Sequence, residues 1–122
     1  MIYVKHYLLF SIVTLGFLEA CAASPESIAP AYVSDMTYQA WTCEQMAQEQ
    51  PRLSTALAAA YTQQSNARSN DTIGVIFLGL PVSTLSGGNM AGEVGRLKGE
   101  LQAIQRAATF KNCSLPPIPA PS

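Results

Sequence analysis

The sequence is poor in charged side chains and in histidine, the residues on which most catalytic and metal sites depend. Only 12% of its 122 residues are charged, and His6 is the single histidine. Seven Lys and Arg against eight Asp and Glu give a net charge of −1, which excludes a strong electrostatic footprint for nucleic acid. We therefore expect no nucleic-acid partner, no metal site and no catalytic activity. The length allows one small domain.

The sequence also lacks the motifs that nucleotide-dependent and hydrolytic enzymes require. It contains neither a G-x-x-x-x-G-K-[ST] phosphate loop nor a G-x-S-x-G nucleophile elbow. The carboxylate pairs Glu44 with Glu49 and Glu93 with Glu100 fit the solvated faces of helices. The segment 85–89 (LSGGN) resembles the LSGGQ signature of ABC-transporter ATPases, which leaves a transporter accessory as one alternative function.

Hydrophobic runs long enough to cross a bilayer are absent as well. The first apolar run, residues 8–18, follows Lys5 and contains no charge. A membrane-spanning helix needs about 20 apolar residues, so this shorter run is typical of the core of a signal peptide. We interpret residues 1–20 as a signal peptide, which removes His6 from the mature chain.

Cys21 follows directly after Leu18, Glu19 and Ala20, a pattern that resembles the lipobox of bacterial lipoproteins. In that family a leucine stands three residues before the cysteine and a small residue directly before it. Glu19 departs from the small neutral residue that is usual between them. The resemblance covers only the signal peptide and Cys21. It implies cleavage before Cys21 and a covalent lipid, including palmitate, on this residue, with no other cofactor.

The resemblance also implies a location in a bacterial cell envelope. Ala22 stands where an aspartate retains many lipoproteins at the inner membrane, which favours the periplasmic face of the outer membrane. Two alternatives stay open. Residues 20–22 (ACA) also fit an A-x-A cleavage site, which predicts a soluble periplasmic protein, and an uncleaved signal peptide would leave an N-terminal anchor.

Three cysteines are an odd number for an exported chain. A lipid on Cys21 leaves Cys43 and Cys113, and the oxidising periplasm permits a disulfide between them. The alternative is a pair of unrelated buried thiols. We expect the disulfide, because the helix pattern described next brings the two cysteines together.

Two segments have the spacing of apolar residues that predicts an amphipathic helix. Thr42 and Gln45 fit a capping box at the start of the first, which we expect over residues 42–68 with a kink or break at Pro51. The second is predicted over residues 91–111, about 31 Å long. The apolar stripe of the first helix consists of Cys43, Met46, Leu53, Leu57, Ala60 and Tyr61. That of the second consists of Val94, Leu97, Leu101, Ile104 and Ala108.

We expect the two helices to form an antiparallel hairpin, because this arrangement places Cys43, at the start of the first, beside Cys113, after the end of the second. The predicted fold is therefore mainly α, a two-helix hairpin closed by a disulfide. The helical domain covers residues 37–113. Residues 21–36 are expected to be a flexible tether after the lipid, and the Pro-rich residues 114–122 a disordered tail.

An apolar, Gly-rich tip, residues 71–90, is expected to connect the two helices. No charge occurs between Thr72 and Gly92. Three interpretations stay open: a segment buried against the hairpin, one that enters a membrane or joins copies of the chain, and one that spans a membrane. The candidate contact residues are Ile73, Val75, Ile76, Phe77 and Leu78.

A second candidate contact surface is the glycine face of the second helix. Gly92, Gly95 and Gly99 fall together opposite the apolar stripe, and small residues at this spacing let helices approach closely. We predict that this face contacts another protein or another copy of the chain; the alternative is a locally weak helix start. Tyr38 and Trp41 are expected to cap the hairpin base, although rings in that place also suit stacking on a sugar or a lipid.

As a whole the sequence resembles small envelope lipoproteins of proteobacteria. This resemblance predicts a structural or accessory role at a membrane, with an envelope protein or a second copy as partner. The alternatives are a membrane-inserting or self-associating hairpin, such as a pore component, and the transporter accessory suggested by residues 85–89.

Overall fold

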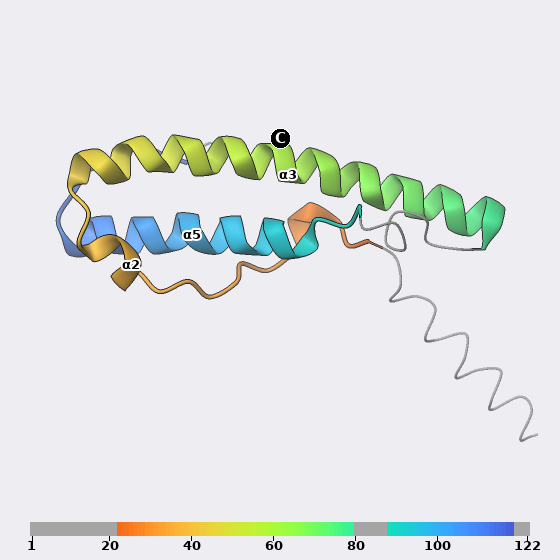
Figure 1. Cartoon of the computed structure of the whole chain (residues 1–122), viewed down its shortest axis with the longest axis horizontal. Coiled ribbons are helices and arrows are strands. Elements are labelled where there is room, and N and C mark those ends of the chain that lie inside the picture. Colours follow the sequence, from red (N-terminus) through yellow and green to blue (C-terminus); the bar gives the residue numbers. More distant parts are fainter. Residues whose placement is uncertain (1–21, 80–87, 119–122) are drawn as a thin grey trace, which may run out of the picture.

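The computed structural model describes residues 22–79 and 88–118, and its two long helices lie side by side (Figure 1). In chain order the elements are a 3-10 turn η1 (Pro25–Ser27), α2 (Met36–Gln39), α3 (Cys43–Leu78) and α5 (Ala91–Phe110). The described residues form no strand, so the prediction of a mainly α protein is confirmed. The predicted second helix is α5, which begins and ends within one residue of its predicted bounds.

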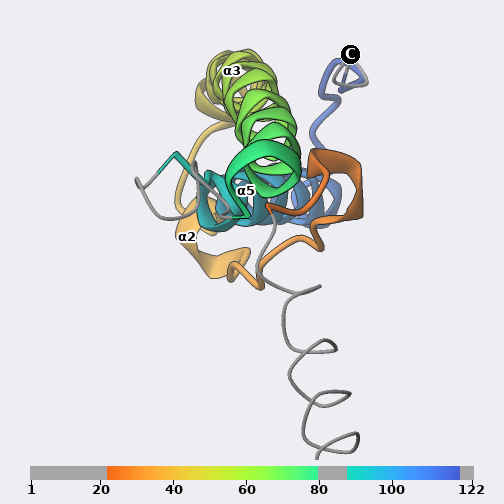
Figure 2. The same ribbon diagram turned by 90° about the vertical axis from the view of Figure 1, so that its right-hand side faces the viewer.

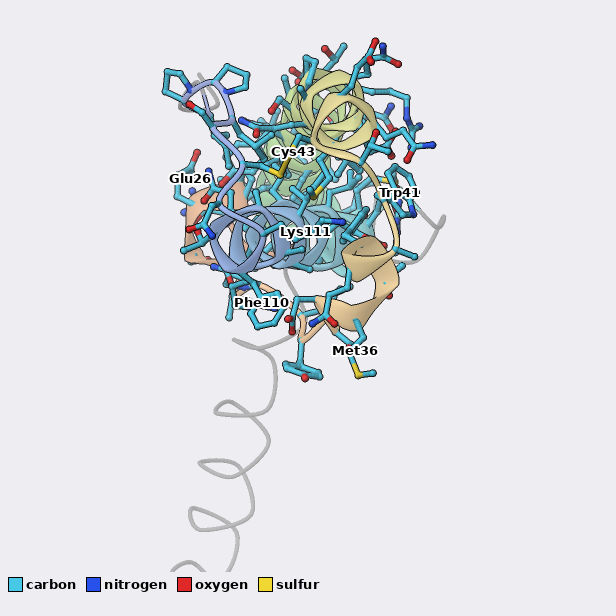
Figure 3. All side chains as sticks on the ribbon, turned by 90° about the vertical axis from the view of Figure 1, so that its left-hand side faces the viewer. Glu26, Met36, Trp41, Cys43, Phe110 and Lys111 are labelled. Atoms are coloured by element: carbon cyan, nitrogen blue, oxygen red, sulfur yellow. A yellow bond between two sulfur atoms is a disulfide. The ribbon has the colours of Figure 1, made fainter. Side chains whose placement is uncertain are left out.

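α3 and α5 run in opposite directions. At one end a disulfide joins Cys43, the first residue of α3, to Cys113, just after α5, with 5.4 Å between their Cα atoms. At the other end the side chain of Gln64 binds the backbone N–H of Met90, directly before α5. Figure 3 views the molecule from the disulfide end, where Cys43 and Lys111 lie close to the viewer. The predicted pair of long helices and its disulfide are therefore confirmed.

α3 begins with the predicted capping box. The Thr42 Oγ1 atom accepts a hydrogen bond from the Gln45 backbone N–H at 3.1 Å, and the Gln45 Oε1 atom accepts one from the Thr42 N–H at 2.8 Å. These two bonds satisfy backbone donors at the start of the helix, where the first N–H groups have no partner within the helix.

Pro51 lies inside α3 without interrupting it. A proline within a helix costs roughly 3 kcal/mol, because it removes one backbone hydrogen bond and crowds the preceding turn. Met46 and Leu53, on either side of Pro51, are both buried in the core together with residues of α5. Of the predicted kink or break at Pro51, the break is wrong, since α3 is continuous there and packing on both sides of the proline outweighs its local preference.

α3 also continues past its predicted end at Arg68, to Leu78. Its buried stripe continues at spacings of three and four residues, through Gln64, Ala67, Asp71 and Gly74. These residues are polar or small, so hydrophobic periodicity alone ended the predicted helix too early. Gly79, with φ 71°, terminates α3 in the left-handed conformation that favours glycine. Residues 71–78 therefore belong to α3 and not to the connecting segment.

The core lies between α3 and α5 and has two parts. The first lies near the middle of the pair and consists of Leu53, Leu57, Ala60, Tyr61, Val94, Leu97 and Leu101. The second lies at the disulfide end and consists of Tyr38, Met46, Ala103, Ile104, Ala107 and Ala108. Except for the exposed Cys43, every residue predicted for the two apolar stripes is buried.

Residues 22–42, here called the N-terminal strap, run along α5, mostly on the side away from α3 (Figures 1 and 2). The backbone N–H of Ala31 donates to the Gly95 carbonyl at 2.8 Å. The Nζ atom of Lys98 donates to the carbonyls of Pro25 and Ile28, at 2.8 and 2.7 Å. The prediction of a flexible tether over residues 21–36 is therefore wrong for residues 22–36.

Cationic side chains near the C-terminal end of α5 also bind carbonyl groups of the strap. A guanidinium nitrogen of Arg106 donates to the Val33 carbonyl at 2.7 Å. Lys111 donates to the carbonyls of Gln39 and Trp41, at 2.9 and 2.6 Å. Apolar periodicity could not predict these contacts, because the strap uses its backbone to make them.

The chain after α5 packs against α3. The Nε2 atom of Gln50 donates to the Pro116 carbonyl at 2.5 Å, and the side chains of Leu115 and Ile118 pack against the two parts of the core. The prediction of a disordered tail over residues 114–122 is wrong for residues 114–118, because these two apolar side chains occupy partly buried positions.

Several predictions lie outside the described residues. These are the signal peptide at residues 1–20, Cys21 with its lipid, residues 80–87 of the connecting segment, and residues 119–122 of the tail. Within the part of the chain that the structure describes, no helix combines the length and the apolar character that a membrane span requires.

Candidate functional site

α3 is much longer than α5, so one end of the helix pair consists of α3 without α5 beside it. α5 begins opposite Gln64, whose Oε1 atom accepts a hydrogen bond from the Met90 N–H at 2.6 Å. Residues 65–78 of α3, here called the overhang, extend beyond this point by about 21 Å at 1.5 Å per residue. Figure 2 views the molecule from this end. The overhang and the start of the strap form the candidate site.

Buried polar side chains of α3 bind the start of the strap. Gln64 is fully buried, and its Nε2 atom donates to the Ala23 carbonyl at 2.8 Å. Two turns further along α3, the Oδ2 atom of the buried Asp71 accepts a hydrogen bond from the Ala22 N–H at 3.0 Å. Burial of an amide or a carboxylate is costly unless hydrogen bonds compensate it, so these contacts fix Ala22 and Ala23 against α3.

The last turns of α3 expose apolar side chains to solvent. In residues 73–78, here called the α3 tip, these are Ile73 (55% exposed), Val75 (41%), Ile76 (71%), Phe77 (79%) and Leu78 (70%). Successive residues of a helix are about 100° apart, so these side chains surround the helix axis and do not form a single stripe. A helix that is apolar on all sides suits surroundings other than water. The interpretation that these residues are buried against the hairpin is therefore wrong.

Charged side chains are nearly absent from the overhang. Between residues 62 and 79 the only ones are Arg68, which is exposed, and Asp71, which is buried. The other described cations bind strap carbonyls (Lys98, Arg106, Lys111) or glutamates (Arg52, Arg96). Among the described residues, Arg68 is therefore the cation that stands beside the α3 tip without an ion pair.

The glycine face of α5 is covered by the chain itself. A Cβ atom added to Gly99 would overlap the carbonyl oxygen of Ala31, and one added to Gly95 would lie 3.2 Å from the carbonyl oxygen of Ala29. The prediction that these two glycines contact another protein or another copy is therefore wrong, because the strap is their partner. Gly92 is exposed, and a Cβ added to it would have no neighbour within 4 Å.

The rings of Tyr38 and Trp41 lie at the disulfide end, edge to face, with their centroids 5.1 Å apart. Tyr38 is buried in the second part of the core, and its hydroxyl donates a hydrogen bond to Glu100. Burial, and then this hydrogen bond, raise the pKa of Tyr38 well above its ordinary value of 10.0. The predicted cap over the base of the helix pair is confirmed.

Three of the four glutamates considered as carboxylate pairs bind arginines, and the fourth, Glu44, accepts a hydrogen bond from Gln48. Glu93 and Glu100 both bind Arg96, at 2.7 and 3.4 Å, and Glu49 binds Arg52. Hydrogen bonds from these arginines lower the pKa of Glu49 and of Glu93 below the usual carboxyl value. The described residues also contain no group of three or more His, Cys, Asp or Glu that would suit a metal ion.

Of the LSGGN segment, only Gly88 and Asn89 lie within the described residues. The Oδ1 atom of Asn89 accepts a hydrogen bond from the Ala91 N–H at 2.9 Å, next to the start of α5. This contact supports a turn that leads the chain into the helix.

Sequence patterns did not predict that Gln64 and Asp71 would hold Ala22 and Ala23. The two side chains are seven residues apart, about two helical turns, so they share one face of α3. If polar residues are included in the helical spacing, both side chains fall on the same stripe as Leu57 and Tyr61.

Comparison with known proteins identifies no relative of the chain, because no family model, no curated protein and no solved structure matches it.

Proposed function

We propose that this protein is a bacterial envelope lipoprotein, anchored in a membrane by a lipid on Cys21, with a structural or accessory role. The membrane is the first partner, and an envelope protein or a second copy of the chain is the second. The periplasmic face of the outer membrane is the favoured location.

The observation that carries the proposal is the disulfide between Cys43 and Cys113. It uses two of the three cysteines of the sequence and leaves Cys21, the cysteine of the lipobox-like segment, for another role. In bacterial lipoproteins, which this segment resembles, the cysteine that directly follows the cleavage site of the signal peptide carries the lipid.

The contacts between α3 and the start of the strap are a second observation that supports the proposal. Asp71 and Gln64 hold Ala22 and Ala23 against α3, so a lipid on the preceding residue joins the folded domain almost directly. A loose tether would let the domain move away from the membrane, whereas this attachment keeps it at the surface. Such close attachment suits a protein that supports or completes a membrane-bound assembly.

A non-catalytic role fits the side chains that the structure describes. The buried Gln64 and Asp71 bind the backbone of the strap, and Lys98 binds it from α5. Glu49 and Glu93 pair with arginines. The first three groups join segments of the chain to one another, and the two ion pairs connect neighbouring turns of a single helix.

The proposal is tested by labelling cells with a palmitate analogue and by fractionating their membranes. We expect the wild type to carry the label and to sediment with outer membranes. Cys21→Ser should lose the label and most of the sedimentation, while the matched variant Cys43→Ser with Cys113→Ser should keep both. Label that survives in Cys21→Ser, or an unlabelled wild-type chain in the soluble periplasmic fraction, would overturn the proposal.

A further inference from the structure

We propose that the α3 tip inserts into the surface of the same membrane that the lipid on Cys21 enters. This inference rests on the proposed lipid anchor and adds a second point of membrane contact, made by the protein itself. The five exposed apolar side chains of residues 73–78 supply that contact.

The lipid attachment point and the α3 tip lie at the same end of the molecule. Cys21 precedes Ala22 directly, and the Cα atoms of neighbouring residues are about 3.8 Å apart. The Ala22 N–H is 3.0 Å from the Oδ2 atom of Asp71. Phe77 lies only about 9 Å further along the axis of α3. A bilayer that holds a lipid on Cys21 is therefore within reach of the tip.

The chemistry of the tip suits a bilayer better than a groove on a protein. A helix that lies flat on a membrane or in a groove presents one apolar stripe and keeps a polar face. The α3 tip exposes the apolar side chains of four successive residues, 75–78, which are about 100° apart around the axis, so its apolar surface is not confined to one stripe. We therefore expect α3 to enter the membrane end-on, with its axis steeply inclined to the surface.

The length of the tip sets the depth of insertion. Residues 73–78 rise by about 7.5 Å, which matches the depth of roughly 5–10 Å to which surface helices bury their apolar faces. The last carbonyl groups of a helix have no partner within it and need water or headgroups. The end of α3 therefore stays in the interfacial region.

Exposed polar side chains directly precede the α3 tip, on the side away from the membrane. Ser69, Asn70 and Thr72 are exposed there, and so is Arg68. A cation beside an apolar surface binds the anionic headgroups of a bilayer, since the surface potential attracts it. Among the described residues, Arg68 is the cation at this end that takes part in neither an ion pair nor a contact with a strap carbonyl.

Insertion of the α3 tip fixes the orientation of the whole helix pair. α3 contains 36 residues, about 54 Å, so the disulfide end projects away from the membrane. Partners of the envelope assembly then meet the disulfide end and the sides of the pair, while the tip faces lipid.

The test uses the mature, lipidated protein in two variants, each with a single tryptophan at one end of the molecule. Trp41 is first replaced by phenylalanine, which keeps a ring against Tyr38. Phe77→Trp then reports on the tip, and Phe110→Trp is the matched control, because both phenylalanines are exposed, at 79% and 74%, at opposite ends. Each variant is reconstituted into vesicles of phosphatidylethanolamine and phosphatidylglycerol, with or without bromine on the acyl chains.

We expect brominated lipid to remove most of the emission of Trp at position 77 and to leave that at position 110 nearly unchanged. Equal emission at position 77 in both kinds of vesicle, with palmitate present on Cys21, would overturn the insertion and leave the anchor intact. Quenching at position 77 in a protein without lipid on Cys21 would support the insertion and overturn the anchor. Crosslinking of position 77 to position 77 of a second copy, without quenching, would also overturn the insertion.

Discussion

The two ends of the helix pair are stabilised in different ways. At the disulfide end, Cys43 and Cys113 are joined covalently, and the buried Tyr38 and Met46 fill the space between α3, α5 and the strap. At the other end, single buried polar side chains hold the strap and the start of α5, and beyond them α3 is exposed and apolar. One end therefore provides stability, while the other presents an exposed apolar surface for contact.

Removal of the disulfide should cause the largest loss of stability. The bond closes a loop with a sequence separation of 70 residues, for which loop entropy predicts about 4 kcal/mol in the free energy of unfolding. We expect Cys43→Ser with Cys113→Ser to lower the urea midpoint of unfolding strongly. Reduction of the wild type by a thiol should have the same effect. An unchanged midpoint would mean that the packed core, and not the covalent bond, stabilises this end.

At the opposite end, Gln64→Met should cost about 2 kcal/mol. The substitution keeps the volume of the side chain but removes the partners of the Ala23 carbonyl and the Met90 N–H. Urea unfolding measures the loss, and faster hydrogen exchange of the Met90 amide locates it. Gln63→Met is the matched control, because Gln63 directly precedes Gln64 in α3 and is exposed. Equal effects of the two variants would contradict the role of Gln64 as a buried clamp.

Substitution of two glycines of α5 tests the contact between this helix and the strap. Gly99→Ala should lower the free energy of unfolding by about 1 to 2 kcal/mol, because its methyl group overlaps the Ala31 carbonyl and displaces the strap. Gly92→Ala should raise it by up to about 1 kcal/mol, because alanine favours a helix and this position has open space. Proteolysis of the strap should become faster only in Gly99→Ala. The same sign in both variants would contradict the strap contact.

The helix pair could be predicted from the sequence because each of its signals is either a local pattern or a pair of cysteines. The stripe from Val94 to Ala108, the capping box at Thr42 and the pairing of Cys43 with Cys113 all use patterns with one dominant structural meaning. The first two predictions needed only residues that lie close together in the sequence, and the third needed only the positions of two cysteines.

The candidate site could not be predicted in the same way, because its contacts are polar and distant in sequence. The carboxylate of Asp71 binds a backbone group 49 residues away, and the Nζ atom of Lys98 binds a carbonyl 73 residues away. Backbone carbonyls occur in every residue, so no sequence pattern marks those of the strap. The apolar character of residues 73–78 was visible, but only the continuation of α3 through Asp71 showed that they project from the domain.

Alkaline pH should weaken the disulfide end through Tyr38. The pKa of Tyr38 is raised in the folded protein, so above pH 10 the unfolded chain loses this proton while the folded protein keeps it. The contribution of Tyr38 is full below about pH 10 and is lost as the pH rises, at about 1.4 kcal/mol per pH unit. Unfolding by urea between pH 8 and 11 measures the slope.

Two variants show whether Tyr38 causes this slope. Tyr38→Phe should be less stable than the wild type at pH 8, because it loses the hydrogen bond to Glu100, but its stability should fall less above pH 10. Tyr32→Phe is the control, since Tyr32 is 87% exposed, and it should follow the wild type at every pH. Parallel curves for all three proteins would assign the alkaline loss to other groups.

Polar substitution of the α3 tip should have the smallest effect on stability of the variants proposed for the two ends. Ile76→Ser with Phe77→Ser removes two side chains that are 71% and 79% exposed, so the free energy of unfolding should change by no more than about 0.5 kcal/mol. The same double variant in a Cys21→Ser background should lose the residual flotation with vesicles that Cys21→Ser alone retains. This difference arises because the tip then has no apolar surface to bury in lipid. A loss of stability above about 1 kcal/mol would show that the tip packs within the protein, and both ends of the molecule would then serve its stability.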